Sequence, residues 1–154
     1  MRRGYSILEL LIVAAITVVI ATTVFLSLGG YRGRKDLDLT AEKAVALLRD
    51  AQSRAMRQAS STSWGIHFDN SSTTPSYSLF GGSSYATSAV SGFYRLPNFI
   101  IYATATVPSG SSTNIVFTQL TGSASASTSI KFFYTQDANA SATIFISSSG
   151  AVFY

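Results

Sequence analysis

The chain opens with the stretch Arg2-Arg3-Gly4-Tyr5-Ser6-Ile7-Leu8-Glu9-Leu10-Leu11-Ile12, in which a single carboxylate stands at the edge of an apolar run. No further charged residue follows Glu9 until Arg32. At a helical rise of about 1.5 Å per residue, roughly twenty apolar residues cover the roughly 30 Å hydrocarbon thickness of a bilayer. The stretch from Leu10 to Tyr31 therefore predicts a membrane-spanning helix.

A cleaved secretory signal also begins with basic residues and an apolar run, but it differs from this segment. The apolar region of such a signal is usually about 7–15 residues long and ends in a small-residue cleavage site. Here the run is longer and continues to Gly30 and Tyr31 without such a site. Glu9 also needs a reason, because a carboxylate at mid-helix depth in a membrane costs about 2.5–3.5 kcal/mol.

These residues resemble the class III signal of type IV pilins and type II secretion pseudopilins. In that family a short basic leader ends in glycine, a membrane prepilin peptidase cuts after it, and the new amino terminus is N-methylated. The resemblance implies a leader at 1–4, cleavage between Gly4 and Tyr5, methylation of Tyr5 and a role for Glu9 in assembly. The family usually has phenylalanine or methionine where this chain has Tyr5, which remains aromatic.

The resemblance also implies a partner for Glu9. In the family this glutamate is thought to neutralise the free amine of a neighbouring subunit, here the amine of Tyr5, as the subunit enters a filament. Two charges that are costly to bury alone become tolerable as a pair, whereas one partner left alone is heavily penalised. The pair would therefore select the correct register between neighbouring subunits more than it would strengthen their contact. The alternative is a plain membrane anchor in which Glu9 has no such role.

The charges are concentrated in the first sixty residues, which hold nine of the eleven Lys and Arg and five of the seven acids. Loss of Arg2 and Arg3 with the leader lowers the net charge from +4 to +2, which weakens any case for a nucleic-acid partner based on basicity. Cationic residues flank both ends of the span, so the positive-inside rule is close to a tie. The resemblance breaks it, placing the amino terminus in the cytoplasm and the rest outside a single-pass inner or cytoplasmic membrane protein.

Beyond the span, Gly29, Gly30 and Gly33 predict a bend or a loosened turn, because each costs about 1 kcal/mol in a helix relative to alanine. Residues 32–60 then predict an amphipathic helix, since apolar residues recur at spacings of three and four. The predicted buried stripe consists of Leu37, Ala41, Ala44, Val45, Leu48, Ala51, Ala55, Met56 and Ala59. The charged residues between them, Lys43, Arg49, Asp50, Arg54 and Arg57, are interpreted as a solvated face with weak helical ion pairs.

From residue 61 the pattern changes to short aromatic and β-branched runs separated by Ser, Thr, Gly and Asn, which predicts antiparallel sheet. The predicted strands are 62–68, 76–80, 92–96, 99–102, 114–118, 129–134, 143–147 and 151–154. Ser148-Ser149-Gly150 is expected to form the turn of a final hairpin. The sequence therefore predicts an α+β fold, in which a leader (1–4), a transmembrane and filament-core segment (5–31) and an amphipathic helix (32–60) precede a β-rich head (61–154).

The sequence offers little catalytic chemistry, so we expect a protein that is not an enzyme and needs no cofactor. There is no cysteine, and His67, the single histidine, is interpreted as a half-buried strand residue and not as a metal ligand. Asp69 and Asp137 begin short polar stretches that could form calcium-binding loops, but ordinary turn residues explain them better.

Two further stretches narrow the resemblance. Residues 46–58 with 65–68, and residues 143–152, resemble the helix-to-strand junction and the last hairpin of H-type pseudopilins and FimT-like minor pilins. This implies a minor subunit of a type II secretion pseudopilus or type IV pilus. Its implied partners are other pilin or pseudopilin subunits, the prepilin peptidase, the inner-membrane assembly platform and membrane lipid. A DNA-binding minor pilin and the major pilin of a filament stay open as alternatives, although Arg95 and Lys131 are few cations for DNA.

Overall fold

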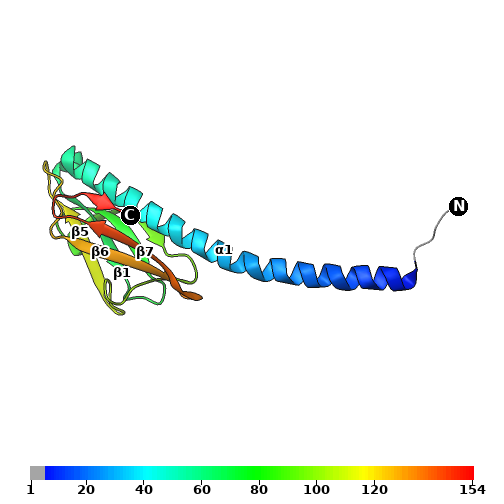
Figure 1. The fold of residues 1–154 in the computed structure, drawn as a ribbon. Coiled ribbons are helices and arrows are strands. Elements are labelled where there is room, and N and C mark those ends of the chain that lie inside the picture. The colour runs from blue at the N-terminus through cyan, green and yellow to red at the C-terminus, as the bar shows by residue number, and fades with distance from the viewer. Residues whose placement is uncertain (1–5) are drawn as a thin grey trace.

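The dominant element is α1, one helix from Ile7 to Met56 (Figure 1). The computed structural model describes residues 6–154, with the side chains of residues 26–29 outside that description. Ser6 is the N-cap and Glu9 lies in the first turn, where the helix dipole favours a negative charge. After α1 the chain turns sharply, since Gln58, Ser60 and Ser61 all have a positive φ.

The helix runs unbroken through Gly29, Gly30 and Gly33, so the predicted loosened turn is absent from this part of α1. Figure 1 shows the helix axis curving gradually between the head and the free end. Gly33 is buried against the ring of Tyr134, and a Cβ at this position would overlap the ring. Packing therefore overrides the low helix propensity of glycine here.

The rest of the described chain forms a β-rich head with two short helical turns, η1 (Ala59–Ser61) and η2 (Tyr85–Thr87). Its strands are β1 (Trp64–Asp69), β2 (Ser76–Gly81), β3 (Ala89–Arg95), β4 (Ile100–Tyr102), β5 (Ser112–Phe117), β6 (Thr128–Tyr134), β7 (Asp137–Ile146) and β8 (Val152–Phe153). They form two four-stranded sheets with the orders β3-β2-β1-β5 and β4-β6-β7-β8. All the strand pairs are antiparallel, as predicted.

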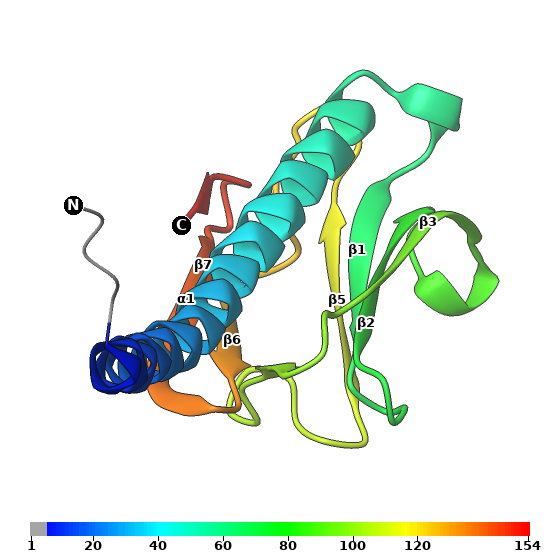
Figure 2. The same cartoon turned by 90° about the vertical axis from the view of Figure 1, so that its right-hand side faces the viewer.

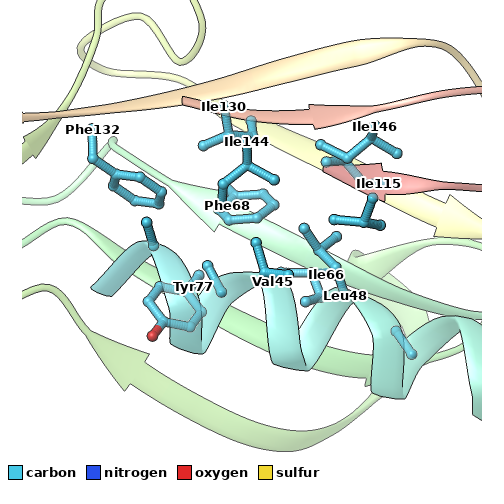
Figure 3. Close-up of a cluster of buried hydrophobic side chains, with 14 of the residues drawn as sticks. Val45, Leu48, Ile66, Phe68, Tyr77, Ile115, Ile130, Phe132, Ile144 and Ile146 are labelled. Atoms are coloured by element: carbon cyan, nitrogen blue, oxygen red, sulfur yellow. The ribbon is translucent and has the colours of Figure 1, made fainter. Parts of the chain in front are cut away.

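Both sheets face α1, which lies across them in Figure 2. The close-up in Figure 3 shows Val45 and Leu48 of the helix directed toward apolar side chains from both sheets. Of the predicted stripe, seven residues are buried: Leu37, Ala41, Ala44, Val45, Leu48, Ala51 and Ala55. Met56 is 43% exposed, and Ala59 is only partly buried against the core. The expected α+β arrangement of a long helix on an antiparallel head is therefore confirmed.

The final hairpin is also confirmed. β7 and β8 pair through Phe145 with Phe153 and Ile146 with Val152. Gly150 has a φ of +88°, a backbone conformation that glycine adopts without the cost other residues incur. Its N–H donates to the carbonyl of Ser147 at 2.8 Å. The predicted turn at 148–150 is therefore closed by its glycine.

Candidate assembly site

The first half of α1 has no protein cover within the described residues. Its most apolar 18-residue window has a mean hydropathy of 2.6 and is 0% buried. Ile7 and Phe25, near the two ends of this segment, are 80% and 81% exposed. Exposed apolar surface on this scale needs lipid or another protein to remove it from water. By length and composition, α1 is the helix in the described chain that can cross a membrane.

The threonines of this segment satisfy their own hydroxyl groups. Thr17 donates to the carbonyl of Val13 at 2.8 Å, and Thr22 donates to that of Val18 at 2.8 Å. Thr23 donates to the carbonyl of Ile20 at 2.9 Å. Bonds of this kind remove the need for water, so these three residues are compatible with an apolar surrounding.

Glu9 is different, because it is exposed and has no ion-pair partner within residues 6–154. The next charged residue, Arg32, is 23 positions further along the chain, which corresponds to about 35 Å along a helix. A cation that pairs with Glu9 must therefore come from residues 1–5 or from another molecule.

The same spacing indicates the depth at which Glu9 would lie in a bilayer. About 35 Å slightly exceeds the roughly 30 Å of the hydrocarbon core, so Glu9 and Arg32 fit at opposite edges of the membrane. At an edge the carboxylate reaches water, and its cost is smaller than at the centre of the bilayer. A carboxylate at the edge of the bilayer therefore avoids most of the cost of burial.

The proposed processing site, Gly4 and Tyr5, lies outside the described residues. Ser6 is the first residue that the structure describes, and it directly follows these two positions. Cleavage between Gly4 and Tyr5 and methylation of Tyr5 therefore stay predictions.

Several polar contacts hold the head on the second half of α1. Arg34 forms an ion pair with Asp137 at 2.6 Å, at the turn between β6 and β7. The Arg49 guanidinium donates to the carbonyl of Val152 at 3.2 Å, and the Tyr154 hydroxyl donates to Asp38 at 3.0 Å. These contacts join α1 to the start of β7 and to the β8 region, both in the second sheet.

The predicted solvated face of α1 is confirmed in part. Asp50 and Arg54 form the expected helical ion pair at 2.9 Å, and Lys43 and Arg57 are exposed. Arg54 also lies over the ring of Trp64, 4.8 Å from its centroid. The Arg54 side chain therefore packs on the head. Arg49 also contacts the head, so this face of α1 is not entirely solvated.

The contact between Gly33 and Tyr134, and the pair of Arg34 with Asp137, were not predicted. A signal for the first contact is present in the sequence, because Gly33 precedes Leu37 and Ala41 at a spacing of four and so shares their helix face. Gly33 is therefore a member of the buried stripe as well as a residue of low helix propensity. The Arg34 pair joins residues 103 positions apart, and no local pattern indicates it.

His67 lies in β1, as predicted, and it is more buried than expected, with 9% exposed. Its Nδ1 lies 2.6 Å from Oδ1 of Asn114 on β5, and its ring stacks on Tyr85 at a centroid distance of 3.7 Å. Within the described residues, no group of three or more His, Cys, Asp and Glu side chains is placed to hold a metal ion.

Asp69 and Asp137 both accept hydrogen bonds from backbone two residues ahead. The Ser71 N–H donates to Asp69 at 2.8 Å, and the Asn139 N–H donates to Asp137 at 3.0 Å. Burial tends to raise the pKa of Asp69, but the hydrogen bonds from Ser71 and the charge of His67 lower it overall. The bond from Arg34 and those from the Asn139 and Ala140 backbone lower the pKa of Asp137. These are the contacts of turn residues.

A single exposed apolar helix that continues into an α+β head defines a pilin-like arrangement. Over 49 residues the chain is 45% identical to Type II secretion system protein H of Aeromonas hydrophila. The match covers 32% of this chain and 27% of that protein, so the chain spans about a quarter of the length of this curated relative. No protein-family profile matches the chain, and no solved structure does.

Proposed function

We propose that this chain is a pilin-like structural subunit of the H type, which joins a type II secretion pseudopilus or type IV pilus as a minor component. The proposal includes cleavage between Gly4 and Tyr5 by a prepilin peptidase and N-methylation of Tyr5. The observation that carries it is the apolar half of α1, exposed along its length, with Glu9 in its first turn. The partial identity with Type II secretion system protein H adds independent support.

The membrane holds the subunit before assembly, with the amino terminus in the cytoplasm and the head outside. Lipid covers the apolar half of α1 there, and Glu9 lies at the edge of the bilayer. In a filament the helices of neighbouring subunits replace the lipid, so Glu9 enters a dry environment. An unpaired buried charge costs about 3–5 kcal/mol, and only a neighbour that brings its amine to Glu9 avoids that cost. The pair therefore selects subunits in the correct axial register.

A matched pair of variants tests the role of Glu9. Glu9→Gln and Glu42→Gln each remove one carboxylate from an exposed position on α1. We expect Glu9→Gln to stay in the membrane but to fall at least about tenfold in sheared filaments, because it forfeits a buried charge pair. We expect Glu42→Gln to assemble normally. Equal amounts of both variants in the filament fraction, measured by immunoblot, would contradict the role of Glu9.

Processing is tested by mass spectrometry of the protein purified from membranes. The mature chain is expected to begin at Tyr5 and to carry one added methyl group. A chain that begins elsewhere would overturn the proposed site while leaving the assembly test of Glu9 intact.

The Lys and Arg residues of the head, Arg95 and Lys131, lie on different sheets. Arg95 lies on β3 of the first sheet, over the ring of Phe93, and Lys131 lies on β6 of the second, over Phe133. Since affinity for the DNA backbone grows with the number of phosphates neutralised, these two cations favour a structural role over DNA binding.

Two experiments separate the alternatives. Gel shift across a salt series tests DNA binding, and abundance in sheared filaments separates a minor from a major subunit.

A further inference from the structure

An open polar hollow lies where α1 leaves the head. It has a volume of about 480 Å³ and is lined by Gly30, Tyr31, Arg34, Tyr134, Gln136 and Asp137. A second hollow of about 360 Å³ shares Arg34 and Asp137 and continues toward Asp38 and Asn139. The uncharged run of the sequence ends at Tyr31, so the first hollow stands at the level of the phospholipid headgroups.

Arg34 supplies hydrogen-bond donors to this hollow. Its Nε and Nη2 donate to Oδ2 of Asp137 at 3.1 and 2.6 Å. A guanidinium has five N–H donors, so this contact leaves others for a ligand, and the side chain is 67% exposed. Tyr31 is 68% exposed at the same level, where the rings of tyrosine are favoured at membrane interfaces.

Asp137 supplies acceptors beside these donors. Its Oδ2 accepts from Arg34, and its Oδ1 accepts from the Asn139 N–H at 3.0 Å. The side chain of Asp137 is 24% exposed, so a cationic donor can reach the carboxylate from the open side of the hollow. Because Arg34 and Asp137 are close together and neutral as a pair, the hollow suits a ligand that carries both charges and not a simple anion.

We propose that this hollow binds the headgroup of a phosphoethanolamine phospholipid, with its phosphate at Arg34 and Tyr31 and its primary ammonium at Asp137. A phosphocholine headgroup has the same two charges, but its quaternary nitrogen has no N–H to donate. The entrance is open beside Gly30, since nothing lies within 4 Å of the place where a Cβ would stand. The bound lipid would fix the depth and rotation of the head at the membrane surface. The proposal depends on the membrane span and not on assembly into a filament.

Lipid retention by the full-length protein tests the proposal. The protein in detergent micelles receives equal amounts of dioleoyl-phosphatidylethanolamine, -phosphatidylcholine and -phosphatidylglycerol, and native mass spectrometry counts the adducts. We expect the ethanolamine lipid to exceed the choline lipid at least about tenfold, as one hydrogen bond to a charged group predicts. Equal retention of these two lipids, or a preference for the phosphatidylglycerol, would overturn the proposal.

Variants place the ligand in the hollow. Arg34→Gln is expected to lower retention of all three lipids, and Asp137→Asn to remove the preference for ethanolamine over choline. Arg57→Gln is the matched control, because Arg57 is an exposed cation at the opposite end of α1. An exposed ion pair contributes little to stability, so an unchanged near-ultraviolet circular dichroism spectrum is expected for each variant. Equal losses in Arg34→Gln and Arg57→Gln would contradict the site.

Two further samples separate the lipid from its headgroup and from the assembly proposal. Soluble glycerophosphoethanolamine is expected to give no adduct, since it lacks acyl chains to lie on the apolar helix. An adduct as abundant as that of the lipid would overturn a membrane source. Glu9→Gln is expected to retain the lipid as the unchanged protein does, so a failure of Glu9 in assembly leaves this result unaffected, and a loss of lipid in that variant would contradict the site.

Discussion

Gly33 positions the head by lacking a side chain. The ring of Tyr134 occupies the space that a Cβ would take, and the Tyr134 hydroxyl donates to Gln136 at 3.0 Å. The neighbouring pair of Arg34 with Asp137 holds the same turn between β6 and β7. The packing of Tyr134 on Gly33 therefore positions the base of the head on α1 just beyond the membrane span.

Alanine substitutions at Gly33 and Gly30 should have opposite effects on stability. Alanine in a helix interior ordinarily adds up to about 1 kcal/mol relative to glycine. Gly30→Ala should show part of this gain, because nothing is within 4 Å of the new Cβ and Gly30 lies before the buried part of the helix. Gly33→Ala drives a methyl group into the Tyr134 ring, and overpacking of this kind costs about 1–3 kcal/mol. Thermal unfolding in micelles, followed by near-ultraviolet circular dichroism, measures both. A Gly33→Ala protein as stable as Gly30→Ala would contradict the packing argument.

Among the elements, β4 connects the two sheets through one side chain. The Tyr102 hydroxyl donates to the carbonyl of Ser76 on β2 at 2.7 Å. Its ring is edge-on to Phe68 of β1 at 6.1 Å and tilted toward Phe132 of β6 at 5.4 Å. Tyr77, on β2, is also buried. The junction between the sheets therefore depends on tyrosines in their neutral form.

Stability should fall as the pH rises above 10. Burial raises the pKa of Tyr102, and burial together with Tyr94 raises the pKa of Tyr77 to about 12. The unfolded tyrosines ionise near pH 10 while the folded ones stay protonated, so the stabilisation is complete below pH 10 and is lost above it. The loss is complete near pH 12 for Tyr77 and continues to higher pH for Tyr102. Each group contributes a slope of up to about 1.4 kcal/mol per pH unit. Urea midpoints at pH 9, 10 and 11 measure it.

Tyr77→Phe tests the assignment of this pH dependence. The variant removes one ionising group, so its stability should depend less steeply on pH above 10 than that of the unchanged protein. An unchanged slope would show that Tyr77 does not take part.

The elements were predictable where the signal is local. The stripe from Leu37 to Ala55 and the glycine turn at 148–150 follow from periodicity and turn chemistry within a few residues. The division into two sheets does not, because β1 pairs with β5 as well as with β2. Alternating strands of similar length fit many orders, and the order is decided by packing on α1. Glu9 could be singled out from sequence, whereas the Arg34 hollow required the fold.

At the scale of the whole molecule, α1 joins an exposed apolar segment to a head that has a buried core. Residues 7–25 are exposed throughout, whereas buried positions in the described chain begin at Gly33 and end at Val152. The head therefore has its own core, and the apolar half of the helix is available for lipid or neighbouring subunits. Sites far apart without shared partners contribute independently to stability.

The fragment from Arg32 to Tyr154 should consequently be soluble and fold without the anchor. It keeps Gly33, Arg34 and every buried residue of the described core, so its free energy of unfolding should lie within about 0.5 kcal/mol of that of the full chain in micelles. A second fragment that starts at Leu39 loses Leu37, which is 3% exposed, and the Arg34 contact. Removal of one buried leucine costs about 2–5 kcal/mol, so this shorter fragment should unfold at lower urea. Size-exclusion chromatography and urea unfolding measure both fragments. Aggregation of the longer one, or equal stability of the two, would mean that the core does not begin where α1 leaves the membrane.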